Sequence, residues 1–83
     1  MRIGTVKRSL VATTRDPRLG SSSILEVEID GTRIAALDNL STHVGQEVLI
    51  LTGCAAQTLA SDMDRVADAV IVAIVDSGTK PLE

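Results

Sequence analysis

The residues best suited to chemistry in this chain are one histidine, one cysteine and two closely spaced aspartates. His43 lies in a polar stretch, and a lone histidine cannot supply the nucleophile, base and orienting group of a hydrolytic triad. We therefore interpret His43 as a solvated loop residue. Asp62 and Asp64 flank Met63, but two carboxylates fall far short of the roughly six to eight oxygen ligands that calcium takes.

Cys54 is the only cysteine, so the chain can form neither an internal disulfide nor a zinc site built from several His and Cys ligands. It stands at the expected start of a helix, where a thiolate would be favoured. The adjacent Ala55 and Ala56 instead favour a surface built for close packing. The glycines never approach the spacing of a dinucleotide-binding or P-loop motif. The sequence therefore predicts no catalytic, cofactor-binding or metal-binding residue.

The composition narrows the class of protein further. The chain has 83 residues and no Phe, Trp or Tyr, although 45% of its residues are hydrophobic. Eight Lys and Arg against 11 Asp and Glu give a net charge of −3, which argues against a nucleic-acid partner. Basic residues concentrate near the start of the chain, and we interpret them as an exposed strand edge and loop. They are Arg2, Lys7, Arg8, Arg15 and Arg18.

A chain of this size usually needs disulfides, a metal or oligomerisation to be stable. Because the first two lack the residues, oligomerisation is the expectation. No apolar stretch is long enough to cross a membrane, no signal peptide is visible after Met1, and the unpaired cysteine fits a reducing cytoplasm. We expect one barrel domain over residues 1–77 and a tail over 78–83, in which Leu82 and Glu83 are a candidate tag remnant.

Hydrophobic patterning predicts five strands and one short helix. The strands are expected at 3–14, with a bend or bulge, and at 24–29, 32–37, 47–52 and 69–75, with loops at 15–22 and 38–46. Asp30-Gly31 predicts a tight hairpin, because a type I′ turn needs residues that tolerate positive φ. Gly53 ends the fourth strand, Cys54 to Ala60 has the composition of one or two helical turns, and 61–65 is a connector. The fold class is therefore an all-β, five-stranded barrel resembling the oligonucleotide-binding fold, with one helix between strands 4 and 5.

The last strand points to a partner subunit. Residues 69–75 are all apolar, whereas a barrel strand directs alternate residues outward. One short helix cannot cover the outer faces of both this strand and the strand at 47–52. We expect a neighbouring subunit to cover them, since large exposed apolar patches usually mark interfaces. The alternative is a monomer in which small residues such as Ala69 and Ala73 face solvent.

A small barrel of this kind also suits a second class of function, the binding of a ligand or of single-stranded nucleic acid. Proteins of that class stack bases on aromatic side chains above a basic groove. This chain is acidic and has no aromatic residue, so that function is the alternative to a structural role. An enzyme subunit is a third and more remote alternative.

Several short motifs follow one another in a characteristic order. The first strand and loop supply Met1-Arg2-Ile3, Val6, Val11, Thr13 and Leu19; the central block supplies Leu25-x-Val27, Ala36-x-Asp38 and Val44-Gly45-x-x-Val48-Leu49; the closing strand supplies Asp68 to Asp76. Their order and spacing resemble the EutN/CcmL family of bacterial microcompartment vertex proteins over about residues 1–77. The resemblance implies a homopentamer without cofactor or catalysis, which caps the vertices of a shell tiled by hexameric shell proteins in the bacterial cytoplasm.

The resemblance also implies roles for particular residues. In the family, the loop before the shared glycine lies close to the five-fold axis and usually reads Gly-Ala-Gly. Here it reads Ser41-Thr42-His43, and these three residues are the pore candidates. Five His43 side chains around an axis would change charge between about pH 5 and 8.

Candidate interface residues come from the helix start and the closing strand. They are Gly53, Cys54, Ala55, Ala56, Asp68, Val70, Val72, Ile74 and Asp76. Cys54 and Ala55 replace serines usual in the family, Gln57 replaces an arginine and Ala73 a glycine, so polar contacts made there in relatives are not expected here. Weaker candidates for shell contact are Arg15, Pro17 and Arg18.

Overall fold

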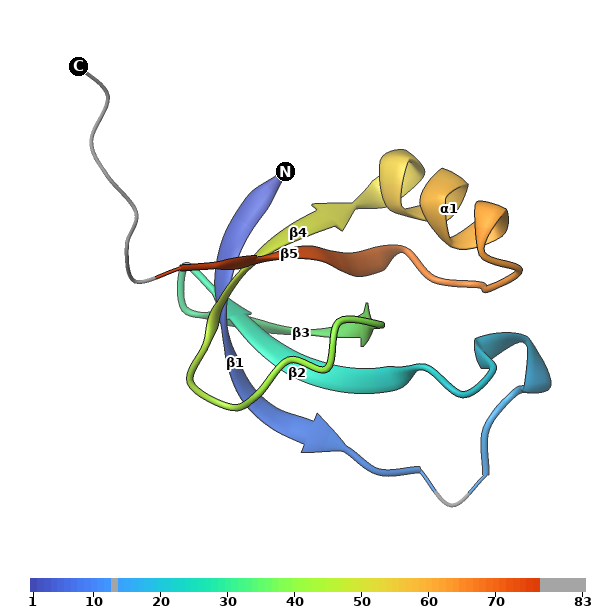
Figure 1. Cartoon of the computed structure of the whole chain (residues 1–83), viewed down its shortest axis with the longest axis horizontal. Coiled ribbons are helices and arrows are strands. Elements are labelled where there is room, and N and C mark those ends of the chain that lie inside the picture. The colour runs from blue at the N-terminus through green and yellow to red at the C-terminus, as the bar shows by residue number, and fades with distance from the viewer. Residues whose placement is uncertain (13, 77–83) are drawn as a thin grey trace.

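The computed structural model describes residues 1–12 and 14–76, which form a five-stranded barrel with one helix packed on its outside (Figure 1). The strands are β1 Arg2–Leu10, β2 Ser23–Ile29, β3 Thr32–Asp38, β4 Glu47–Thr52 and β5 Ala69–Val75. Helix α1, Gly53–Asp62, joins β4 to β5, and a 3-10 turn η1, Pro17–Leu19, lies between β1 and β2. The predicted fold class and the place of the helix are confirmed. The predicted tail at 78–83, with Leu82 and Glu83, lies outside the described residues.

The strands close in the order β1-β2-β3-β5-β4. All neighbouring pairs are antiparallel except β3 and β5, which run parallel and meet through a single pair, Leu37 with Val70. The β2–β3 hairpin turns at Asp30 and Gly31, whose φ angles of 49° and 82° are the positive values that the predicted turn requires. The seam between β3 and β5 is therefore the least paired part of the barrel.

The ends of several elements differ from the prediction. The first strand was expected to reach Thr14, but β1 ends at Leu10, opposite Ile24, because its partner β2 begins only at Ser23. Beyond that point Val11 is 91% exposed. The bulge in β1 lies between Val6 and Arg8, where the register with β2 shifts by one residue.

The helix is also longer than predicted. It begins at Gly53, which was expected to separate it from the fourth strand, and it continues to Asp62, so Ser61 and Asp62 are helical rather than part of a connector. Gly53 both separates β4 from the helix and forms the first residue of α1. Its φ of 67° lets the chain turn directly from β4 into the first helical turn. The third strand extends by one residue beyond the prediction, to Asp38.

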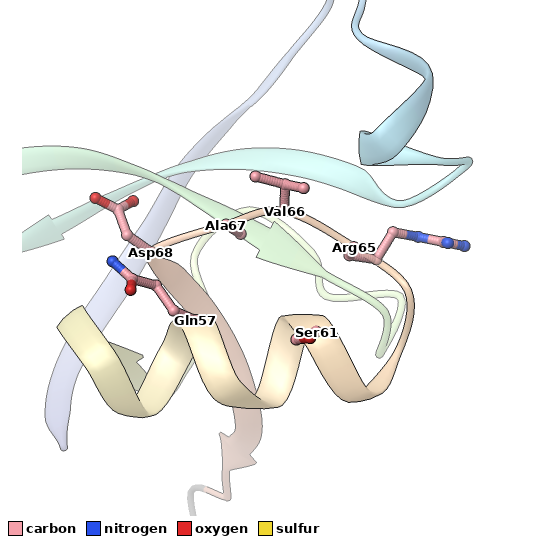
Figure 2. Close-up of a pocket in the computed structure, with 6 residues that line it drawn as sticks. All are labelled: Gln57, Ser61, Arg65, Val66, Ala67 and Asp68. Atoms are coloured by element: carbon pink, nitrogen blue, oxygen red, sulfur yellow. The ribbon is translucent and has the colours of Figure 1, made fainter.

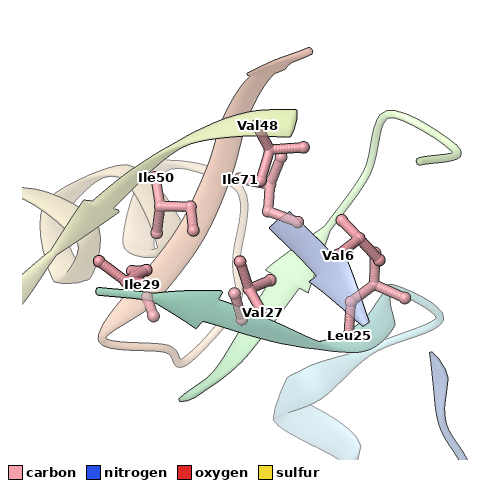
Figure 3. Packing of buried hydrophobic residues seen from close by; sticks show 9 residues of the cluster. Val6, Leu25, Val27, Ile29, Val48, Ile50 and Ile71 are labelled. Carbon is pink, nitrogen blue, oxygen red and sulfur yellow. The ribbon is translucent and has the colours of Figure 1, made fainter. Parts of the chain in front are cut away.

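The barrel interior is filled by aliphatic side chains that come from all five strands (Figure 3). The cluster comprises Val6, Leu25, Val27, Ile29, Ala36, Val48, Ile50, Ala69 and Ile71, with Ile34 at its edge. Each of the nine is at most 6% exposed. The interior is therefore closed without any aromatic ring, as the composition demanded.

A second apolar cluster lies outside the barrel, beneath the helix. Ala56 and Ala60, one turn apart on α1, pack against Leu37 of β3 and Val70 of β5. The last strand thus buries its first residues on both sides, with Ala69 and Ile71 in the interior and Val70 under the helix. This arrangement explains its lack of polar residues at that end, and it leaves the other end uncovered.

Gly4 lies in close contact with side-chain and backbone atoms of the neighbouring strand β2. A β-carbon placed there would lie 2.6 Å from Cγ1 of Val27 and 3.0 Å from the carbonyl oxygen of Glu28. Neither atom can move away easily, because Val27 is fully buried and the carbonyl belongs to the backbone of β2. Only glycine therefore fits at this position.

We predict that Gly4→Ala lowers the free energy of unfolding by about 1–3 kcal/mol, the usual cost of an extra methyl group in a packed core. Denaturant titration followed by circular dichroism measures this loss. Adding Val27→Ala to the same chain removes the clashing methyl, so the two losses should be less than additive. Equal or greater than additive losses would show that the contact with Val27 is not the cause.

Candidate functional site

One outer side of the barrel is apolar. The inward direction of a β-carbon at Gly4 places Ile3 on the outer face of β1. Ile3 pairs with Leu49 of β4, and Leu49 pairs with Ala73 of β5, so these three side chains share one face. Ile3 is 59% exposed, and Leu49 and Ala73 are half-buried. We call Ile3, Leu49 and Ala73 the apolar strip.

The opposite side of the barrel is charged. Glu26 of β2 accepts hydrogen bonds from Arg8 on β1 and from Arg33 on β3, with N–O distances of 2.9 and 3.1 Å. Lys7 of β1 forms an ion pair with Glu28 of β2, with an N–O distance of 3.0 Å. Such a face remains stable in water, so the apolar strip, rather than the β2–β3 hairpin, is the side suited to contact with another protein.

The start of helix α1 adds small, neutral residues to the exposed surface. Gly53, Cys54 and Ala55 are exposed, and the helix carries no charged residue before Asp62. A surface helix normally presents charged or polar residues on its outer face. This neutral surface is consistent with the close packing that the sequence predicted there.

The other predicted interface residues divide into two groups. Asp68, Ile74 and Asp76 are exposed, whereas Val72 is half-buried and packs against the cluster beneath the helix. Ala56 and Val70 are buried in the chain's own cluster beneath the helix, where they support α1. The sequence alone could not tell the exposed Ile74 from the buried Val70, because both are apolar residues of the same strand.

A groove runs between α1 and the segment that leads into β5. It has a volume of about 600 Å³ and is lined by Gln57, Ser61, Arg65, Val66, Ala67 and Asp68. Figure 2 shows Gln57 and Asp68 together at one end and Arg65 at the other. The amide N–H of Gly53 donates to the carbonyl of Asp68 at 2.9 Å and fixes that end. This groove could not be predicted from the sequence, because its walls come from segments with no shared motif.

The described residues contain no cluster of side chains suited to a metal ion. Within 1–12 and 14–76, no group of three or more His, Cys, Asp or Glu side chains is placed to hold a metal ion. Over the same residues, no helix is both long enough and apolar enough to span a membrane. The notable features of the site are therefore surfaces and loops.

The loop that carries the pore candidates, Asn39–Gln46, is fixed at its start by a buried carboxylate. Asp38 is 4% exposed, and its oxygens accept hydrogen bonds from the backbone N–H of Leu40 at 3.0 Å and of Thr42 at 2.9 Å. The hydroxyl of Thr42 donates to the same carboxylate at 2.9 Å. Ser41 sits between them with a φ of 56°, in the left-handed region. Asp38 thus determines the path of the backbone at Ser41 and Thr42.

The end of the same loop is tied to β1. The N–H of Gly45 donates to the carbonyl of Val6 at 2.9 Å, and the N–H of Val6 donates to the carbonyl of Gln46 at 3.0 Å. The side-chain oxygen of Gln46 accepts from the N–H of His43 at 2.7 Å. The His43 and Ser41 side chains remain exposed, while Thr42 is half-buried against Asp38. The loop therefore presents Ser41 and His43 outward from a backbone held at both ends.

The predicted shell-contact residues already have partners within the chain. Arg15 is exposed, and its Nη2 donates to the carbonyl of Ser22 at 2.7 Å. Asp16 precedes Pro17 at the start of η1 and accepts from the backbone and guanidinium of Arg18. Hydrogen bonds from Arg18 lower the pKa of Asp16 from 3.8 to about 2, and the same pair raises the pKa of Arg18. The charge of Arg18 is thus largely balanced in place.

Asp38 is the functional residue whose role sequence reasoning missed. It was part of the Ala36-x-Asp38 motif, but no role was assigned to its carboxylate. A signal was available, since Asp followed four residues later by Thr at the end of a strand is the pattern of a side chain that bonds nearby backbone N–H groups.

Comparison with known proteins gives a consistent result. The family model described as "Ethanolamine utilisation protein EutN/carboxysome" matches residues 1–76. A search of curated proteins finds no significant match.

Solved structures match over nearly the whole chain. The pentameric shell protein MSM0273 from the RMM microcompartment is 29% identical, with a TM-score of 0.84, covering 100% of this chain and 99% of that one. CsoS4B from Halothiobacillus neapolitanus is 30% identical, with a TM-score of 0.82 and coverage of 92% and 99%. CcmL from Nostoc sp. PCC 7120 is 33% identical, with a TM-score of 0.75 and coverage of 92% and 89%.

We predict that Asp38→Ala releases the Asn39–Gln46 loop and lowers the free energy of unfolding by about 1.5–3 kcal/mol, because it removes a charged acceptor from buried donors. Hydrogen exchange at the Leu40 and Thr42 amides measures the release. Thr42→Val, which removes only the hydroxyl bond, should have a smaller effect at the same amides. If Asp38→Ala left both amides as protected as before, the carboxylate would not hold the loop.

The Asp16–Arg18 pair makes a prediction about pH. Because the folded pKa of Asp16 is lowered, its contribution to the η1 turn is present above about pH 3.8 and is lost as the pH falls through about 2. In Arg18→Ala, the pKa of Asp16 should return toward 3.8, as followed by carboxyl carbon NMR. Arg15→Ala serves as the control and should leave the Asp16 titration unchanged. A low pKa that persists without Arg18 would contradict this cause.

Proposed function

This chain belongs to the EutN/CcmL family, and we propose that it is a structural protein of a bacterial microcompartment shell, in which five copies form a ring that caps a vertex. The observation that carries the proposal is the family match over residues 1–76. It is supported by the full-length likeness, at 29% identity, to the pentameric shell protein MSM0273 from the RMM microcompartment.

The surfaces of the barrel suit a closed ring. In a cyclic assembly, one side of each subunit meets a different side of the next, and the contacts close after a full rotation. The apolar strip and the neutral start of α1 would form one side of that contact. Complete burial of an exposed Ile side chain, such as that of Ile3, stabilises by about 1.5–3 kcal/mol. Five such contacts would supply the burial that a small barrel without aromatic residues lacks.

We propose that the loop at residues 39–46 faces the five-fold axis of the ring. Ser41, Thr42 and His43 would then surround the central opening, with Asp38 holding each copy of the loop in the same conformation. Arg15, Pro17 and Arg18 on the β1–β2 loop remain weaker proposals for contact with hexameric shell proteins.

The proposed role is geometric rather than catalytic. A sheet of hexamers is flat, and five-fold pieces supply the curvature that closes it into a shell. The alternative, a barrel that binds a ligand or single-stranded nucleic acid, is less favoured. It would need stacking platforms and a basic groove, and the chain contains no aromatic residue and has a net charge of −3.

Native mass spectrometry tests the proposal. We expect a species with five times the chain mass of 8.7 kDa. A monomer that shifts the mobility of an oligonucleotide would instead support the binding-module alternative and overturn the vertex proposal.

We further predict that Ala55→Glu dissociates the pentamer without unfolding the barrel. Ala55 is exposed in the single chain and glutamate is a good helix former, so the subunit should fold, whereas five unpaired carboxylates at a close contact should oppose assembly. Thr32→Glu places the same charge on an exposed residue beside the hairpin turn and serves as the control. An Ala55→Glu chain that remains fully pentameric would exclude the helix start from the interface.

A further inference from the structure

Ser22 is a buried polar residue at the point where three loops meet. It is 4% exposed, although it lies in the loop just before β2. Its hydroxyl donates to the side-chain oxygen of Asn39 at 2.6 Å and accepts from Nε of Arg65 at 3.3 Å. Its carbonyl accepts from Arg15 at 2.7 Å. A buried hydroxyl is costly unless it is bonded, so these partners account for its presence in the interior.

The partners of Ser22 belong to segments that are far apart in the sequence. Asn39 lies 17 residues after Ser22 and opens the loop that carries the pore candidates, and Arg65 lies 43 residues after it, in the turn that follows α1. Figure 1 shows that η1 and the turn after α1 lie at the same end of the barrel as the end of β3. Ser22 therefore joins the loop after β3 to the turn after α1.

The Arg65 side chain also contacts the turn that follows α1. Its guanidinium donates to the carbonyls of Met63 and Asp64 at 3.4 and 3.2 Å. It also lies over Gly20, where a β-carbon would fall within 2.7 Å of three guanidinium atoms. Arg65 lines the groove beside α1, so one side chain contacts both that groove and Ser22. Because the Ser22 hydroxyl oxygen accepts from Arg65, its own O–H is left to donate to Asn39.

We propose that Ser22 is a positioning residue for the pore-side loop: it fixes the first residue of that loop, Asn39, and transmits to it the position of Arg65. This inference rests on the proposed function only for the place of the loop in the ring. The positioning itself is a property of each subunit. Two anchors then act in sequence, with Ser22 holding Asn39 and Asp38 holding Leu40 and Thr42.

A second route between the same loops passes through sulfur. The amide of Asn39 donates to Sδ of Met63 at 3.6 Å, and Met63 also offers its carbonyl to Arg65. A hydrogen bond to a thioether is weak, whereas the bond between Ser22 and Asn39 is short. The proposal therefore assigns the link to Ser22 and leaves Met63 as the competing route that an experiment must exclude.

Hydrogen exchange at the Thr42 amide, followed by NMR, tests the proposal on Ser22→Ala, Arg65→Gln and the double variant. We expect Ser22→Ala to speed exchange about fivefold, the effect of losing one hydrogen bond. Arg65→Gln should also speed it, although Arg65 bonds no residue of the loop among the contacts of the described chain. The double variant should exchange no faster than Ser22→Ala alone, because Arg65 acts through Ser22.

Controls separate positioning from general loss of stability. Ser21→Ala, at the exposed position on the other side of Ser22, should leave exchange at the Thr42 amide unchanged. The Val48 amide in the core should be unaffected in every variant. Asn39→Ala breaks the same bond from the exposed side and should reproduce the effect if Ser22→Ala folds poorly. Unchanged exchange in Ser22→Ala and Asn39→Ala would overturn the proposal, as would an Arg65→Gln effect that persists in full without Ser22. The native mass of each sample reports separately on the pentamer. Failure of the proposed pentameric state can therefore be distinguished from failure of the positioning role of Ser22.

Discussion

The interior of this barrel must be filled by aliphatic side chains alone, and the rest of the structure depends on that constraint. Small side chains fill a barrel only when they pack closely, and the missing β-carbon of Gly4 leaves room for Cγ1 of Val27 on the neighbouring strand β2. What the interior cannot bury is placed outside, where Ala56 and Ala60 bring α1 close to β3 and β5. Helix α1 therefore covers a second apolar core on the outside of the barrel.

The shortage of large apolar side chains also determines which surfaces remain for assembly. The outer face around β2 carries ion pairs, which are well solvated when exposed to water. The outer face around β4 carries the apolar residues Ile3, Leu49 and Ala73. A separation into a charged face and an apolar face suits a ring-forming shell protein, because each subunit of a ring needs an apolar surface that its neighbour can bury. The pore-side loop, held by Asp38 and joined to Ser22, is the part whose shape is repeated around the proposed axis.

The sequence predicted most of the fold because hydrophobic periodicity is local. The hairpin around Asp30-Gly31 and the strand from Ala69 to Val75 were predicted with their observed course. The far end of β1 was wrong, because residues 11–14 have strand-like composition but β2 offers them no partner. The candidate site was harder. That Val70 faces the helix depends on tertiary packing, and the bonds of Ser22 reach residues 17 and 43 positions away, which no local pattern reveals.

The central claim is that the barrel completes its burial by association with copies of itself. The most direct test is the midpoint of denaturant unfolding, measured over a wide range of protein concentration. If folding and ring formation are coupled, mass action requires the midpoint to rise with concentration. A midpoint that stays the same at every concentration, in a chain that remains monomeric, would contradict the account.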